Sequence, residues 1–318
     1  MNGKTPTKIA IVGGAGAVGA STAYALMISG LASEIVLVDV NERRAEGEAM
    51  DLAQGAPFVR PVVVRSGTYA DCADCQIVVV TAGAAQKPGE TRLDLVKKNT
   101  GIFRSMIPEI AQAAPHAILL IVANPVDILT LAALKFSGFP PGRVVGSGTV
   151  LDTARLRALV GQRLNIDPRS VHGYVIGEHG DSEVVAWSRT TVAGMPVADF
   201  CSQRQTECDA DMAAQIAEQV CHAAYEIIER KGATYYAIGL GVRHVIEAML
   251  RDQNTVLTVS TLMTGQFGIS DICLSLPSIV DHGGVEGVIM PQLNEAELAA
   301  LLRSAEVLKQ TARDAGLL

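Results

Sequence analysis

Three glycines of the hexapeptide GAGAVG, Gly14, Gly16 and Gly19, have the spacing G-x-G-x-x-G of loops that bind the pyrophosphate of a dinucleotide. The first glycine of such a loop permits a tight turn, the second lets the pyrophosphate approach the backbone, and the third allows close helix packing. The helix that follows attracts the negative charge at its N-terminus. Asp39 stands twenty residues after Gly19, where a carboxylate would accept hydrogen bonds from an adenosine ribose. We therefore predict a dinucleotide site.

The carboxylate of Asp39 also bears on which dinucleotide binds. It would repel the 2′-phosphate of NADP, so it favours NAD. Arg43 and Arg44 follow closely in the sequence and could pair with that phosphate, so the residue types alone leave NADP open. We predict NAD as the cofactor.

Residue types common in catalysis gather in three other segments, which are 84–95 (AAQKPGETRLDL), 151–157 (LDTARLR) and 177–182 (GEHGDS). The first follows an apolar run and contains Pro88-Gly89, so we expect a loop that can move. It should lie at the carboxyl end of a strand, where an open parallel sheet binds ligands. A dinucleotide site indicates redox chemistry, but the second substrate has to be identified from these segments.

Short apolar runs rich in β-branched residues alternate with helical patterns in the first half of the chain. The runs are 8–13 (KIAIVG), 34–40 (EIVLVDV), 76–83 (QIVVVTAG) and 117–124 (AILLIVAN), with 143–147 (RVVGS) as a further strand candidate. Crossover helices are expected over 20–31 and 93–114. Continuous apolar strands separated by helices are typical of a parallel sheet covered on both faces. We predict a doubly wound α/β (Rossmann) domain over residues 1–146.

Longer helical patterns follow beyond residue 147, over 151–163, 212–231 and 295–312. In the last of these, apolar residues recur at three- and four-residue spacing and so share one helix face. We predict an α+β catalytic and oligomerisation domain over residues 147–318. No Pro- or Ser-rich linker separates the two halves of the sequence, so we expect the domains to pack closely.

The composition disfavours several classes of protein. Lys and Arg number 26 against 33 Asp and Glu, a formal net charge of −7, which provides no broad basic face for nucleic acid. Residues 9–33 carry no charge and are long enough to span a bilayer. Their clustered glycines and polar residues argue against a membrane span, so we predict no membrane partner.

Cysteine usage predicts a reducing compartment. Six cysteines in 318 residues are too few for a disulfide scaffold, and the first residues lack the apolar stretch of a secretory signal. Cys72 and Cys75 have a spacing found in metal and redox sites, but no second Cys/His pair stands at a matching distance. We predict a cytoplasmic protein without a bound metal.

Six sequence motifs, in this order, resemble the lactate/malate dehydrogenase family, and within it the bacterial L-lactate dehydrogenases that respond to fructose 1,6-bisphosphate. They are VGGAGAVG, AGAAQKPGETRLDL, VANPVD, GSGTVLDTARLR, GEHGDS and KGATYY. The resemblance extends from about residue 8 to the C-terminus. It implies an NAD-dependent oxidoreductase that interconverts a 2-oxo acid and a 2-hydroxy acid, assembled as a homotetramer.

The resemblance also implies roles for individual residues. His179 corresponds to the family's proton donor and acceptor; reducing a 2-oxo acid needs a hydride on the carbonyl carbon and a proton on its oxygen. Asp152 corresponds to the partner of the other ring N–H, although Glu178 and Asp181 lie closer in sequence. Arg155, three residues after Asp152 and so on the same helix face, would bind the substrate carboxylate with two parallel hydrogen bonds.

Further substrate contacts are implied in the same way. Arg92 would reach the carbonyl oxygen when the loop closes and polarise it. Asn124 would hold the same oxygen, and Thr234 would flank the substrate.

Gln86 bears on the identity of the substrate. Malate dehydrogenases that resemble this chain carry an arginine at that place, because oxaloacetate has a second carboxylate. Pyruvate has a methyl group there, and an arginine facing it would be an unpaired charge. Gln86 therefore favours pyruvate and L-lactate, while the adjacent Lys87 leaves malate as an alternative if the loop register shifts.

Other cofactor contacts are implied by the resemblance alone. They fall at Val18, Arg44, Tyr69, Gly83, Ala84, Ser105, Val122, Ala123, Asn124 and Ser147. Any one of them could instead contribute to packing at the crowded strand ends.

A second anion site is implied at Arg157 and His172. Arg157 lies two residues from Arg155, about 200° around a helix, and so points away from the substrate. In related bacterial enzymes an arginine and a histidine at these places bind fructose 1,6-bisphosphate at a subunit interface. Such a ligand activates only if it binds the active assembly better than the inactive one.

A non-catalytic dinucleotide sensor is the remaining alternative, since a fold can outlast its chemistry. Such a protein would have little need of His179, Asp152, Arg92 and Arg155 together.

Overall fold

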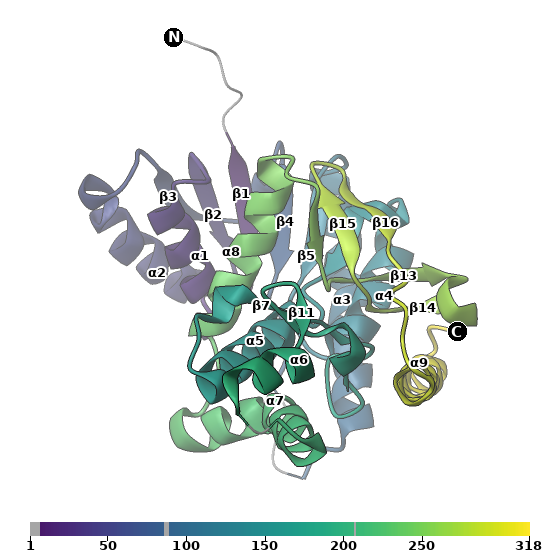
Figure 1. The fold of residues 1–318 in the computed structure, drawn as a ribbon. Helices are drawn as coiled ribbons and strands as arrows, with labels where there is room; N and C mark the ends of the chain where they lie inside the picture. The colour runs from purple at the N-terminus through teal and green to yellow at the C-terminus, as the bar shows by residue number, and fades with distance from the viewer. Residues whose placement is uncertain (1–6, 86–88, 207) are drawn as a thin grey trace.

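The computed structural model describes residues 7–85, 89–206 and 208–318. An eight-stranded sheet with the order β14-β13-β6-β5-β4-β1-β2-β3 forms its centre (Figure 1). Strands β1 to β6 run parallel. Their bounds are Lys8–Val12, Glu34–Val38, Val63–Gly67, Ile77–Val80, Ile118–Ile121 and Val144–Gly146. The parallel, doubly wound sheet predicted from the apolar runs is therefore confirmed.

Alternate residues of each central strand enter two different cores. In β1, for example, Ile9 and Ile11 belong to one buried cluster, whereas Ala10 and Val12 belong to another on the opposite face. Because successive side chains of a strand point to opposite faces, a strand covered on both sides has to be apolar throughout. This requirement explains the unbroken apolar runs of the sequence.

Helices cover both faces of the sheet. The helices of the first half are α1 (Ala17–Ser29), α2 (Glu42–Gln54), α3 (Arg92–Ala113) and α4 (Val126–Ser137). Helix α1 begins three residues earlier than the sequence predicted, directly after the glycine loop, with Gly16 as its N-cap. The charge-free residues 9–33 thus form β1, the loop and α1. Among the described residues, no helix is long and apolar enough to cross a membrane.

The second half of the chain contributes the remaining helices, of which three were predicted within a few residues. These are α5 (Val150–Leu164), α6 (Val197–Arg204), α7 (Ala210–Lys231), α8 (Tyr236–Leu250) and α9 (Glu295–Asp314). The α8 helix, which the sequence analysis did not identify, packs against α1 of the first half (Figure 1).

Two strands from the second half extend the first sheet. β13 (Ser260–Thr264) pairs antiparallel with β6 and β14 (Ser270–Ser275). Smaller sheets are formed by β12 (Thr255–Leu257), β15 (Ser278–Asp281) and β16 (Gly284–Val288), by β7 (Val171–His172), β10 (Thr191–Val192) and β11 (Met195–Pro196), and by β8 (Val175–Ile176) with β9 (Val184–Val185). The two halves therefore share one sheet.

The cysteines differ in state. Cys201 in α6 forms a disulfide with Cys208, a bond that was not predicted from the sequence. Cys72 and Cys75 are free and buried, and they pack in the core beneath the central sheet.

Candidate active site

The glycine loop between β1 and α1 is shaped by close backbone packing. A Cβ atom at Gly19 would lie 2.3 Å from the carbonyl oxygen of Gly13, and one at Gly14 would lie 2.8 Å from the Cβ atom of Leu37. Gly13, with φ at +90°, makes the left-handed turn that the sequence analysis assigned to Gly14. Gly16 would meet one atom within 4 Å, so its outer side is open to a ligand. These constraints fit a dinucleotide-binding loop.

Asp39 is held at the end of β2 by the same loop. Its Oδ2 accepts a hydrogen bond from Ala15 N at 3.1 Å, and its Oδ1 accepts one from Asn41 N at 2.9 Å. The carboxylate lines a cavity of about 170 Å³ together with Gly16, Tyr69 and Gly83. The loop and its acid therefore border a space that could take part of a dinucleotide.

Most of the other residues predicted to contact the cofactor lie at neighbouring strand ends. Gly83 and Ala84 follow β4, Val122 to Asn124 follow β5, and Ser147 follows β6. The buried Asn99 of α3 joins two of these ends. Its Oδ1 accepts a hydrogen bond from Ala84 N at 2.7 Å, and its Nδ2 donates to Asn124 O at 2.9 Å. Asn99 was not predicted from the sequence, although a polar residue on an apolar helix face was a signal.

Three predicted cofactor residues have other surroundings. Val18 packs against the core of the sheet. Arg44 on α2 faces Glu48, with 3.7 Å between Nε and Oε1. Ser105 lies on the exposed face of α3 and donates a hydrogen bond to Ile102 O.

One buried carboxylate joins the residues expected to perform the chemistry. Asp152, in the first turn of α5, has a side chain only 1% exposed. Its Oδ2 lies 2.6 Å from Nδ1 of His179, and its Oδ1 accepts a hydrogen bond from Nη1 of Arg155 at 2.7 Å. His179 and Arg155 therefore meet at one point, although 24 positions separate them in the sequence.

This contact changes the proton affinity of the imidazole. Burial alone would lower the pKa of His179, but the Asp152 carboxylate outweighs burial and raises that pKa to about 9. Burial opposes the ionised form of Asp152 as well, yet the charges of His179 and Arg155 keep its pKa below the ordinary value. The group is therefore organised as a carboxylate between two cations.

A second buried acid holds the backbone of His179. Asp127, in the first turn of α4, accepts a hydrogen bond from His179 N at 2.8 Å through Oδ2. Its Oδ1 accepts one from Ser260 Oγ of β13 at 2.6 Å. Burial raises the pKa of Asp127 to about 6. Asp127 belongs to the motif VANPVD but was given no role from the sequence, and Ser260 offered no local signal.

Arg92 also approaches the His179 segment. It is the first residue of α3, not a loop residue as the sequence predicted, and its side chain is 51% exposed. The guanidinium pairs with Glu178 and, at 3.2 Å, with Asp181. Glu178 N in turn donates to Ser304 Oγ of α9 at 2.8 Å.

Thr234 and Gln86 were also predicted to contact the substrate. Thr234 lies in the connection between α7 and α8. Gln86 lies outside the described residues.

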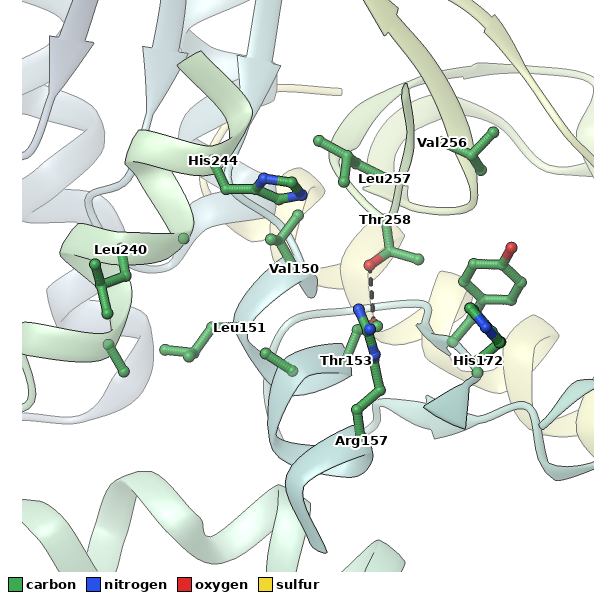
Figure 2. Close-up of a pocket in the computed structure, with 15 residues that line it drawn as sticks. Val150, Leu151, Thr153, Arg157, His172, Leu240, His244, Val256, Leu257 and Thr258 are labelled. Carbon is green, nitrogen blue, oxygen red and sulfur yellow. Dashed lines mark hydrogen bonds between the residues drawn. The ribbon is translucent and has the colours of Figure 1, made fainter. Parts of the chain in front are cut away.

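The predicted second anion site lies around one cavity. Arg157 of α5 and His172 of β7 both line a space of about 410 Å³ beside α8 (Figure 2). Tyr174, His244 and Thr258 are further lining residues. The Arg157 Nε atom is buried and has no hydrogen-bond partner among the described residues. The guanidinium of Arg157 at this cavity therefore has one nitrogen that lacks a hydrogen-bond acceptor from the described residues.

The arrangement around Asp152 can transfer a proton to a bound anion. With Nδ1 of His179 engaged by Asp152, Nε2 is the nitrogen left to face a substrate. Arg155 offers a guanidinium for a carboxylate beside it. The group therefore suits acid–base chemistry on a small carboxylate, next to a loop built for a dinucleotide.

Family comparisons agree with this geometry. Residues 7–146 match the model of the lactate/malate dehydrogenase NAD binding domain, and residues 149–315 match that of the lactate/malate dehydrogenase alpha/beta C-terminal domain. The L-lactate dehydrogenase 1 of Clostridium acetobutylicum is 54% identical over 308 residues, which cover 97% of this chain and 98% of that protein. The L-lactate dehydrogenase of Thermoanaerobacter pseudethanolicus is 52% identical over 307 residues, covering 96% and 98% respectively.

Solved structures give the same result. The minor L-lactate dehydrogenase from Enterococcus mundtii, in its ligands-bound form, superposes with a TM-score of 0.93 at 45% identity and covers 98% of both chains. A lactate dehydrogenase from a Medee basin deep-sea metagenome library has a TM-score of 0.94 at 42% identity and covers 98% of this chain and 99% of its own. Sequence, fold and site geometry agree that the chain belongs to the lactate/malate dehydrogenase family.

Proposed function

We propose that the chain is an NAD-dependent L-lactate dehydrogenase, which transfers a hydride reversibly between NADH and pyruvate and forms L-lactate and NAD. The observation that carries this proposal is the contact of one Asp152 carboxylate with both His179 and Arg155. A three-carbon 2-oxo acid has a carboxylate and a carbonyl oxygen close enough to reach both side chains. The L-lactate dehydrogenases named above support pyruvate as the 2-oxo acid.

The chain would bind NAD with the glycine loop and Asp39. Gly16 keeps a side chain away from the pyrophosphate, Gly14 and Gly19 allow the close backbone packing that shapes the loop, and Asp39 accepts hydrogen bonds from the ribose. When bound, NADH supplies the hydride that reduces the carbonyl carbon. Asn99 keeps the ends of β4 and β5 together beside that site.

His179 manages the proton of the reaction. In the reducing direction, protonated His179 donates its Nε2 proton to the carbonyl oxygen of pyruvate, and in the reverse direction it accepts the proton from the hydroxyl of lactate. Asp152 holds Nδ1–H, which orients the ring and stabilises the imidazolium. Asp127 fixes the backbone from which the ring projects.

Arginines bind and polarise the substrate. Arg155 binds the carboxylate with two parallel hydrogen bonds, a geometry that lysine cannot provide. Arg92 stabilises the negative charge that develops on the carbonyl oxygen. To do so its guanidinium must turn from Glu178 and Asp181 toward the substrate. Asn124 and Thr234 complete the substrate site in this proposal.

The second anion cavity is proposed to bind fructose 1,6-bisphosphate. Arg157 and His172 line it from separate elements, and the buried Nε atom of Arg157 supports the presence of an acceptor from outside the subunit. Two such pairs related by a twofold axis could neutralise both phosphates.

We also propose that the chain assembles as a homotetramer. A groove of about 870 Å³ between α1, α2 and α8 exposes Tyr24, Ile28, Tyr236 and Leu240, which a second subunit would cover.

We further propose that residues 1–146 form the NAD-binding unit and residues 147–318 the catalytic unit. The position of Asp39 in the first part and of Asp152, Arg155 and His179 in the second supports this division. Because β13 joins the first sheet, the two units should fold together and not separately.

Replacing Asp152 by asparagine should lower the proton affinity of His179. The imidazole then loses its carboxylate partner while burial remains, so its pKa should fall from about 9 to about 6.5 or below. In the parent, the imidazolium stabilises the fold fully below about pH 6.5, and this contribution disappears as the pH rises through about 9. Pyruvate reduction should decrease by about 10²- to 10⁴-fold.

The ring C–H resonances of His179, followed by NMR against pH, measure this change. The exposed Asp167→Asn variant serves as the control and should leave the titration unaltered, because Asp167 pairs with Arg169. An unchanged His179 titration in Asp152→Asn would contradict the role given to Asp152.

The choice between pyruvate and oxaloacetate should depend on residue 86. NADH oxidation is measured with each acid for the parent, for Gln86→Arg and for the matched neighbour Lys87→Arg. The parent should prefer pyruvate, and Gln86→Arg should shift the preference toward oxaloacetate by about 100-fold or more, because it supplies a partner for the second carboxylate. Lys87→Arg adds no charge and should keep the parent preference; a parent that prefers oxaloacetate would be a malate dehydrogenase.

Fructose 1,6-bisphosphate should lower the pyruvate concentration that gives half-maximal rate. Arg157→Gln should abolish the response while leaving the rate at saturating pyruvate within about twofold, since Arg157 faces away from the substrate. Arg163→Gln, exposed on the same helix and outside the cavity, should respond as the parent does. Identical pyruvate saturation curves for the parent with and without the bisphosphate would refute the effector site.

A further inference from the structure

Glu183, the residue before β9, has no part in the reaction described so far, yet its carboxyl adjoins the reacting groups. One ligand-type atom from each of Asp152, His179 and Glu183 lies within 4.8 Å of the other two. The Oε1 atom of Glu183 is buried, and no described residue donates a hydrogen bond to it. Burial and the charge of Asp152 together raise the pKa of Glu183 to about 8.

Charged and titratable groups face Glu183 from three directions. Helix α5 contributes Asp152 and Arg155, the segment before β9 contributes His179 and Asp181, and α7 contributes the Cys221 thiol. Asp181 is itself paired with Arg92 and with the hydroxyl of Tyr225. Arg155 and His179 attract an ionised Glu183, whereas Asp152 and Asp181 repel it.

The net charge of the cluster formed by Asp152, Arg155, His179 and Glu183 depends on whether Glu183 holds a proton. With Glu183 neutral, protonated His179, Arg155 and ionised Asp152 have a net charge of one positive unit, which matches a single substrate carboxylate. With Glu183 ionised, the net charge is zero. An ionised Glu183 would also offer Arg155 an internal carboxylate in place of the substrate.

We propose that Glu183 is a positioning residue that keeps its proton in the active enzyme, and that loss of this proton weakens substrate binding at Arg155. The inference depends on the proposed function, because it assigns the substrate carboxylate to Arg155. Loss of the Glu183 proton should therefore raise the KM for pyruvate. It should change kcat less, because an ionised Glu183 also helps His179 retain the proton that it donates.

A divalent cation is a weaker alternative for the same three side chains. Both oxygens of Asp152 are already engaged, one by His179 and the other by Arg155. The guanidinium of Arg155 would lie beside the cation and repel it. A proton on Glu183 removes the negative charge of the buried carboxyl without this repulsion.

The test compares the parent with Glu183→Gln, which has nearly the same shape and cannot ionise. The KM and kcat for pyruvate are measured from about pH 6.5 to 9.5 at saturating NADH. In the parent, kcat/KM should fall as the pH rises because two protons are lost, one from Glu183 and one from His179. In Glu183→Gln, it should fall with the loss of the His179 proton alone. For each protein, kcat/KM at one pH unit above the pKa of Glu183 is divided by its own kcat/KM at pH 6.5. This ratio should be about tenfold higher for Glu183→Gln than for the parent.

Glu226→Gln provides the matched control. Glu226 lies exposed on α7 and pairs with Arg230, so its replacement should leave the parent pH profile unchanged. A Glu183→Gln profile identical to that of the parent would overturn the proposal.

An infrared titration decides the protonation state without reference to activity. The difference spectrum between the parent and Glu183→Gln should contain the carbonyl band of a protonated carboxyl at pH 6.5, and this band should disappear as the pH rises through about 8. A carboxylate band already present at pH 6.5 would overturn the proposal. If the parent reduces no pyruvate at any pH, the proposed function fails instead, and the infrared result still decides whether Glu183 holds a proton.

Discussion

The ion pair network around the buried Asp152 carboxylate is the interaction on which the rest of the site depends. A carboxylate removed from water is costly unless cations and hydrogen bonds compensate it. Here an imidazole occupies one oxygen and a guanidinium the other. The same contacts that stabilise the buried charge also raise the pKa of His179 and orient its ring. In the proposed mechanism, stability and proton transfer therefore have a common origin at this residue.

The sheet explains how groups from distant parts of the sequence reach this point. The ends of the parallel strands carry the glycine loop, Asp39 and Asn124 to one edge, where a dinucleotide can lie across them. Helices α3, α4 and α5 begin at or near the same edge, and their first turns supply Arg92, Asp127 and Asp152. The order of the proposed cofactor, substrate and proton sites thus follows from where strands end and helices begin.

Sequence patterns predicted these elements where the signal was local. The apolar runs identified five of the parallel strands, and the spacing of Asp152 and Arg155 placed them on one helix face, where they are hydrogen-bonded. The resemblance to a known family, not the spacing, selected Asp152 as the partner of His179. The two residues lie 2.6 Å apart in the structure.

Other features depend on contacts between distant segments and had no local signal. The β13 strand, STLMT, mixes polar and apolar residues, so its place beside β6 was not apparent. That placement brings Ser260 to Asp127 and thereby fixes the backbone of His179. Glu183 was missed for a similar reason, because its burial beside Asp152 depends on where the segment before β9 lies relative to α5. Local periodicity predicts an element, whereas the environment of one carboxyl depends on everything packed around it.

The most direct test of the account is a crystal structure with NADH and oxamate, an unreactive analogue of pyruvate. The account predicts that the oxamate carboxylate makes two parallel hydrogen bonds with Arg155. Its carbonyl oxygen should lie about 2.6 to 3.2 Å from Nε2 of His179, with Asp152 still bound to Nδ1. An oxamate carboxylate bound away from Arg155, or a His179 ring that faces a different cavity, would contradict the central claim.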